Sequence, residues 1–213
     1  MAAHVYKLSD GTRIPGVTTV LSRFKESGAL MHWAWEQGRD GKDYRETRDK
    51  AANAGTCAHA LVEAHIKGIQ PDLSPYDGET LEKAQKAFGA FLEWAQASHL
   101  TPVKSETSLI SEKYRFGGTI DTMLIHGKLA IGDWKTSGGV YGDMLAQVAA
   151  YGKLWEENFP DQPITGGYHI LRFDKTYGDF NHHWYSELQD GWDYFRLARE
   201  MYDIDKRLKK RAA

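Results

Sequence analysis

The chain contains the stretch Leu129-Ala130-Ile131-Gly132-Asp133-Trp134-Lys135, the third of three consecutive extended runs. Side chains alternate along a strand, so Asp133 and Lys135 share one face about 6.6 Å apart, and Trp134 points to the other. A carboxylate, which is a hard oxygen ligand, therefore lies beside an ammonium group at a strand end. This pair alone is weak evidence, because Asp40-Gly41-Lys42 repeats it and most such pairs are surface ion pairs.

Further carboxylates are expected near the same strand end. The preceding run contains Gly117-Gly118-Thr119-Ile120-Asp121, and a tight turn at His126-Gly127 can fold Asp121 back beside the third strand. Glu106 lies on the first run, where its carboxylate either reaches the site or faces solvent. Carboxylates hold Mg²⁺ or Mn²⁺, which activate water and neutralise charge during phosphodiester hydrolysis. The cluster is therefore suited to that reaction.

The order of the expected elements indicates an α/β fold. Residues 1–100 are mainly helical and form a cap, and residues 101–213 form a catalytic core within a single domain, 1–213. In the core we expect three strands over 103–110, 114–125 and 128–135, and then a crossover helix over 144–159. Two further strands over 166–173 and 180–185 and a last helix from 188 onward follow. These elements predict a mixed central β-sheet, with a three-stranded antiparallel meander, flanked by helices.

Composition excludes several classes of protein. With 41% hydrophobic and 12% aromatic residues among 213, the chain is too apolar to be disordered. It has no apolar run long enough to span a membrane and no signal-peptide core at its start, so we expect a cytoplasmic protein with no membrane partner. Cys57 is the only cysteine, which excludes a self-contained iron–sulfur cluster. The net charge of -2 does not by itself indicate a nucleic-acid partner.

The motifs around the two aspartates resemble those of the PD-(D/E)XK nuclease superfamily, and within it the RecB-like branch. That branch pairs a motif similar to Gly118–Asp121 with one similar to Ile131–Ser137. A helix with Gln-x-x-x-Tyr follows, here Gln147 to Tyr151, and an upstream helix contains a histidine in a setting similar to Ala54–His59. The resemblance covers roughly residues 14 to 200.

The resemblance implies a restriction-endonuclease-like core and assigns roles to residues. Asp121 and Asp133 would bind Mg²⁺ or Mn²⁺, together with the Trp134 main-chain carbonyl and His59, and Lys135 would be the catalytic lysine. Considered without the resemblance, His59 is more typical of an ordinary helix-face histidine.

Further positions of the resemblance lie around this centre. Glu106 matches the acidic position before the central hairpin, and Gln147 and Tyr151 would contact DNA or brace the site. Thr18 and Thr19 would also contact DNA, in an opening segment similar to that of single-domain exonucleases of phages and of mitochondrial genome maintenance.

The expected function is metal-dependent hydrolysis of DNA, most readily by an exonuclease acting on single-stranded ends in recombination, repair or replication. The chain has no G-x-x-x-x-G-K-[ST] motif, so we expect no nucleotide cofactor, and any translocation would need a separate helicase or recombination protein. Two alternatives stay open. One is a structure-selective or restriction-like endonuclease, and the other is an inactive relative that only binds DNA within a recombination complex.

Overall fold

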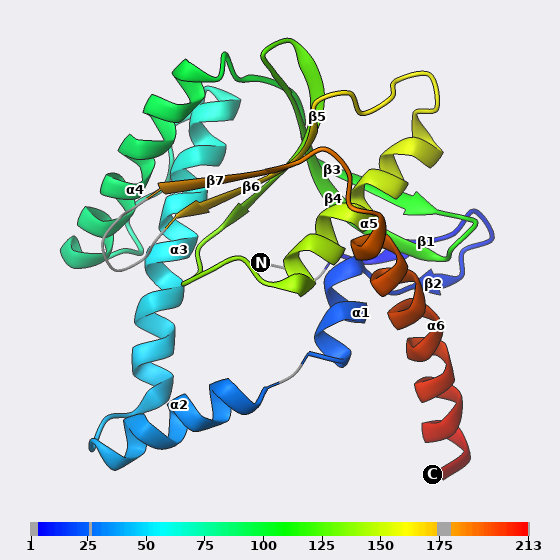
Figure 1. The fold of residues 1–213 in the computed structure, drawn as a ribbon. Helices are drawn as coiled ribbons and strands as arrows, with labels where there is room; N and C mark the ends of the chain where they lie inside the picture. Colours follow the sequence, from blue (N-terminus) through cyan, green and yellow to red (C-terminus); the bar gives the residue numbers. More distant parts are fainter. Residues whose placement is uncertain (1–3, 26, 174–179, 213) are drawn as a thin grey trace.

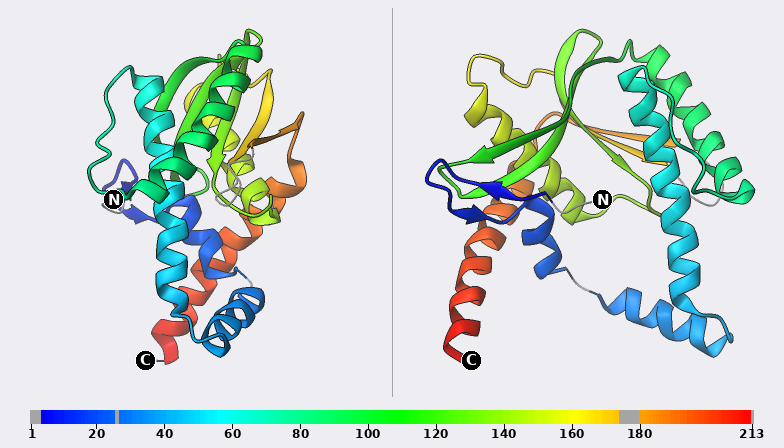
Figure 2. Two further views of the ribbon diagram at one scale, coloured as in Figure 1. Left: turned by 90° about the vertical axis from the view of Figure 1, so that its left-hand side faces the viewer. Right: turned by 180° about the vertical axis from the view of Figure 1, so that it is seen from behind.

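A five-stranded mixed sheet separates two groups of helices (Figures 1 and 2). The computed structural model describes residues 4–25, 27–173 and 180–212. The strands lie in the order β3 (Thr101–Ser111), β4 (Phe116–Ile125), β5 (Lys128–Lys135), β6 (Gly167–Phe173) and β7 (Phe180–Tyr185). Only β5 and β6 are parallel among these neighbours. The α/β fold with a meander, a crossover helix and further strands is thereby confirmed.

The turn between β4 and β5 fixes which residues face each other. His126 and Gly127 have φ of 49° and 75°, the left-handed backbone that two-residue hairpin loops favour. The resulting register pairs Ile125 with Lys128 and ends at the pair Asp121–Gly132. The hairpin therefore brings Asp121 to the end of β5, as the sequence predicts.

Helices cover both faces of the sheet. On one face lie α1 (Val17–Arg23), α5 (Gly142–Asn158) and the start of α6 (Gln189–Ala212), and on the other lie α3 (Tyr44–Lys67) and α4 (Gly78–Ala97). The short α2 (Gly28–Arg39) extends away from the sheet, as does the end of α6 (Figure 1). A small hairpin, β1 (Tyr6–Lys7) and β2 (Arg13–Ile14), precedes α1.

The long helices begin and end at residues with ordinary capping chemistry. The Asp43 and Asp77 side chains accept hydrogen bonds from main-chain N–H groups at the starts of α3 and α4, and Gly68 ends α3 with φ of 65°. No helix in the described part of the chain combines the length and apolar character that a membrane crossing requires.

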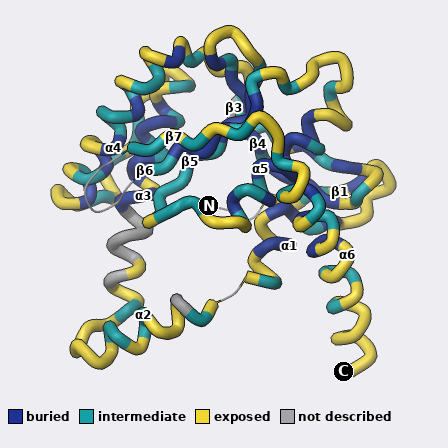
Figure 3. Tube along the Cα trace, in the orientation of Figure 1, coloured by how far each residue is buried: buried dark blue, intermediate teal, exposed yellow. Residues whose placement is uncertain are grey.

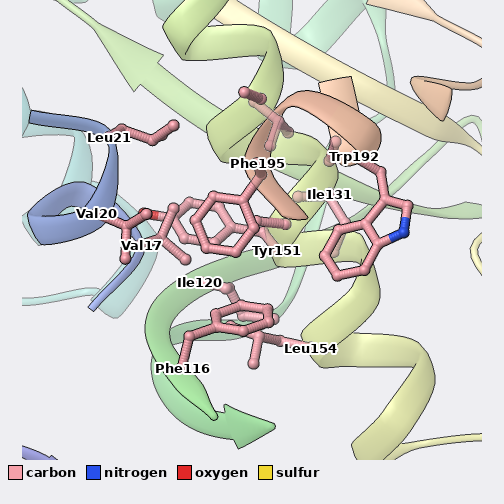
Figure 4. Close-up of a cluster of buried hydrophobic side chains, with 14 of the residues drawn as sticks. Val17, Val20, Leu21, Phe116, Ile120, Ile131, Tyr151, Leu154, Trp192 and Phe195 are labelled. Atoms are coloured by element: carbon pink, nitrogen blue, oxygen red, sulfur yellow. The ribbon is translucent and has the colours of Figure 1, made fainter. Parts of the chain in front are cut away.

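The sheet has a separate apolar core on each face. Figure 4 shows the first core, in which Phe116, Tyr151, Leu154 and Phe195 are buried between the sheet, α1, α5 and α6. The second core lies under α3 and α4 around the fully buried Phe91. Strand β5 contributes to both cores, because its side chains alternate between the two faces.

Helix α5 is buried over more of its circumference than the sequence predicts. The expected apolar stripe consists of Leu145, Val148, Ala149 and Gly152, but Tyr151 and Trp155 are buried as well, and Leu145 is only partly buried. Burial on several sides follows from the position of α5 between the sheet and α6. Tyr151 therefore lies in the core and not on a solvent-facing side of α5.

Phe91 anchors the strand that contains the candidate site. Its ring meets the Trp134 ring edge-on at a centroid distance of 5.2 Å, and Trp134 lies between Asp133 and Lys135. Replacing Phe91 with alanine leaves a cavity and should lower the free energy of unfolding by about 3–5 kcal/mol. Phe88→Ala, at a partly buried ring one turn earlier, should cost less. Urea unfolding followed by circular dichroism measures both, and equal losses would contradict this assignment.

Candidate active site

Asp133 and Lys135 form the centre of a connected polar chain at the end of β5. The Lys135 Nζ lies 2.7 Å from Oδ2 of Asp133, and the two side chains are only 19% and 14% exposed. Lys135 donates a hydrogen bond of 2.9 Å to Oε1 of Gln147, and the Gln147 amide donates one of 2.6 Å to the Tyr151 hydroxyl. The predicted strand motif and the predicted Gln-x-x-x-Tyr motif therefore meet in one network.

The buried Oδ2 of Asp133 is held by the charge of Lys135 and by no hydrogen bond from the described residues. The Lys135 ammonium lies 2.7 Å from this oxygen, within ion-pair distance, and it donates its hydrogen bond to Gln147. Within the described residues, the buried Oδ2 of Asp133 has no hydrogen-bond partner. A buried carboxylate oxygen that is held only by an ion pair still has lone pairs for a further ligand.

Asp121 lies across the strand pair from Asp133 but leans toward the opposite face. Paired residues of neighbouring strands point to the same face, and the partner of Asp121 is Gly132, one residue before Asp133. A Cβ at Gly132 would overlap Met123 in the second core, so that is the face of Asp121. The two aspartates therefore flank the strand end from its two sides.

A bulge in β3 holds the Asp121 carboxylate. The register between β3 and β4 shifts between Lys104 and Thr107, and Glu106 has φ of 48° there. This conformation lets the Glu106 main-chain N–H donate a hydrogen bond of 2.7 Å to Oδ1 of Asp121. The Glu106 carboxylate itself points to the surface and pairs with Lys67 of α3 at 3.1 Å. Glu106 thus supports the site through its backbone.

His59 reaches the strand end from α3. Burial lowers the pKa of its imidazole below the usual value, opposed by the nearby charge of Asp133 and by a hydrogen bond with the Trp134 main chain. The imidazole is therefore neutral near pH 7, which is the form that can ligate a metal. His59 comes so close because Gly55, one turn earlier, has no side chain to collide with Thr136.

The remaining predicted residues lie on two other elements. Burial, with the negative charges of Asp133 and Asp121, raises the pKa of the Tyr151 hydroxyl, which stays protonated near neutral pH. A Cβ at Gly118 would come within 2.9 Å of the Tyr151 ring, so this glycine lets α5 approach β4. Thr18 and Thr19 are exposed on α1 and take no part in this network.

The predicted metal ligands are neighbours but are not assembled as a metal centre. Within the described residues, no group of three or more His, Cys, Asp or Glu side chains is arranged to hold a metal ion. The donor chemistry does fit a hard divalent cation, because Asp133 offers a buried oxygen without a hydrogen-bond donor and His59 is neutral. The chemistry of these donors therefore fits such a cation, but their arrangement is not that of a formed metal site.

Two residues that support the site, Lys67 and Thr136, are not identified from the sequence alone. Lys67 bridges Glu63 and Glu106, and Thr136 receives the close approach of Gly55. The sequence contained one signal for Lys67, since Glu63 lies four residues earlier on a predicted helix, a spacing that favours ion pairs. No local pattern indicated the contact between Gly55 and Thr136, which are distant in the sequence.

Comparisons with known proteins give only distant similarities. No protein-family model matches the sequence, and no curated protein matches it. A crystal structure from Eubacterium rectale, described as "Putative exonuclease", is 13% identical with a TM-score of 0.48, over 68% of this chain and 64% of that one. The structure of SSO0001 is 14% identical with a TM-score of 0.36, over 72% and 74%. Neither similarity is close enough to assign an activity.

The contact between Gly55 and Thr136 predicts opposite effects for two similar substitutions. Gly55→Ala should lower the free energy of unfolding by about 1–3 kcal/mol, because its Cβ overlaps Thr136. Gly89→Ala on α4 meets no atom within 4 Å and should raise that free energy by about 0.5–1 kcal/mol. Adding Thr136→Ala to Gly55→Ala should recover part of the loss. Urea midpoints measure all three, and a stabilising Gly55→Ala would contradict the close approach.

Proposed function

We propose that this chain is a metal-dependent deoxyribonuclease of the PD-(D/E)XK type, acting as an exonuclease on single-stranded DNA ends. The main support is the chain of contacts from Asp133 through Lys135 and Gln147 to Tyr151. It joins two separate motifs of the resemblance at one strand end. Asp121 and His59 lie beside it, which adds the other two motifs.

Mg²⁺ or Mn²⁺ would be held by Asp121, Asp133, His59 and the Trp134 main-chain carbonyl. When bound, the cation supplies an activated water and offsets negative charge on the phosphate under attack. The support for such a ligand is the buried Oδ2 of Asp133, which within the described part of the chain accepts no hydrogen bond and is held only by its ion pair with Lys135.

Lys135 is positioned to act directly on the substrate. Gln147 accepts a hydrogen bond from its ammonium group and is itself held by Tyr151. An ammonium has three N–H donors, so beside the contacts with Gln147 and Asp133 one remains to orient the attacking water or to donate to a phosphate oxygen. Because the side chain is held in advance, ordering it costs no further entropy when DNA binds.

The preference for a single strand is inferred from how enclosed the site is. The Asp133 and Lys135 side chains are largely covered, and α3 approaches the strand end closely at Gly55 and Thr136. A single strand threads into such a site more readily than a duplex does. A separate helicase or recombination protein would supply single-stranded ends, and the pathway would be recombination, repair or replication.

Asp133→Asn tests the proposed chemistry without changing the shape of the side chain. Cleavage of end-labelled single-stranded oligonucleotides with Mg²⁺ or Mn²⁺ should fall by about 100-fold or more, as should cleavage by Lys135→Met. Binding of Mn²⁺ measured by electron paramagnetic resonance should weaken in Asp133→Asn. Asp161→Asn, the same change at an exposed loop residue, should leave both unchanged. Undiminished cleavage by Asp133→Asn would refute the proposal.

A circular substrate separates the exonuclease from an endonuclease that uses the same residues. Circular single-stranded DNA should survive amounts of protein that degrade the same DNA after linearisation, because cleavage starts at an end. Gel electrophoresis of both forms measures the difference. If the unchanged chain cuts the circle and the Asp133→Asn variant does not, the protein is an endonuclease that uses the same residues.

A further inference from the structure

Helix α6 presents a second apolar stripe that no part of the described chain covers. Its first stripe packs on the body through Trp192, Phe195 and Ala198. The second stripe consists of five large apolar side chains that are 47–57% exposed, namely Tyr194, Leu197, Met201, Ile204 and Leu208. Figure 3 shows how much of the end of α6 is exposed.

The spacing of the exposed stripe is that of a coiled-coil seam. Its members follow one another at intervals of three, four, three and four residues, which is the repeat of the a and d positions of a heptad. At 100° per residue, the centre of this stripe lies about 150° around the helix from the packed stripe. The seam therefore faces away from the body and is open to a partner helix.

The charges beside the seam select one orientation of an identical partner. With Tyr194, Met201 and Leu208 at a positions, Glu200 and Arg207 occupy g positions and Asp205 an e position. Parallel pairing would set Glu200 against Asp205 of the partner subunit, which is a pair of like charges. Arg23 and Lys209 offset the charge of Asp205 in part. Antiparallel pairing can set Met201 against the partner's Ile204 and Leu197 against the partner's Leu208. In this arrangement Glu200 of each subunit lies beside Arg207 of the partner subunit, so two attractive pairs form.

We propose that α6 is a dimerisation helix and that its partner is the α6 of a second copy of this chain, packed antiparallel. The body already supports the helix, since α6 packs on α1 and α5 and Arg23 pairs with Asp205 at 2.5 Å. Pairing therefore does not have to fold the helix as well. Four a–d layers form a small interface, so the dimer is reversible and depends on concentration. This inference does not rest on the proposed nuclease activity.

Sedimentation equilibrium of the full chain tests the proposal. The mean mass should rise from 24.1 kDa toward twice that value between about 1 and about 100 µM protein. Met201→Glu, in the middle of the seam, should raise the dissociation constant at least tenfold, and Ile69→Glu, at an equally exposed apolar residue outside the seam, should not. Circular dichroism should show unchanged helix content in both variants.

Charge reversal tests the orientation. Glu200→Arg and Arg207→Glu should each weaken self-association, and an equimolar mixture of the two variants should restore it. A monomer at every concentration, or a dimer that Met201→Glu leaves intact, would overturn the proposal. Stronger association of Glu200→Arg would also overturn it, because relief of the clash with Asp205 is the signature of parallel pairing.

Discussion

Burial of strand β5 on both faces is the constraint on which the rest of the structure depends. Ile131 packs into the core under α5, and Trp134 packs into the core under α3 and α4. Because strand side chains alternate, this packing forces Asp133 and Lys135 toward α5. A shift of one residue in the register of β5 would exchange its two faces and direct the Asp133 and Lys135 charges into the core under α3 and α4. Apolar packing, and not the polar contacts themselves, therefore orients the candidate site.

The same constraint buries a polar network in which one carboxylate oxygen accepts no hydrogen bond from the described residues. Asp133 and Lys135 lose most of their solvent, and a buried ion pair is stabilising only when hydrogen bonds satisfy its remaining groups. Gln147 accepts a hydrogen bond from Lys135, but within the described chain Oδ2 of Asp133 has only its ion pair with Lys135 and accepts no hydrogen bond. Local conflicts of this kind are expected where a ligand or substrate completes the site.

The sequence was sufficient to predict elements with strong periodicity, and it predicted less about how they face each other. Strand 128–135 has the predicted bounds, and the turn at His126 places Asp121 as expected. The face of Asp121 depends on the register, and the fate of the Glu106 carboxylate depends on a bulge. Neither has a local sequence signal. Gln147 and Tyr151 are expected to contact DNA or brace the site, and the sequence alone does not show that tertiary packing buries Tyr151.

Helix α5 separates the candidate site from the proposed dimer surface. Its Leu145 and Ala149 meet the start of α6 at Gly191, where a Cβ would lie within 3.0 Å of the Leu145 carbonyl oxygen. Gln147 and Tyr151 lie on the opposite side of α5, toward β5. The seam on α6 is turned further away still. A second copy bound along α6 would therefore approach from the side of α5 that is remote from Asp133 and Lys135.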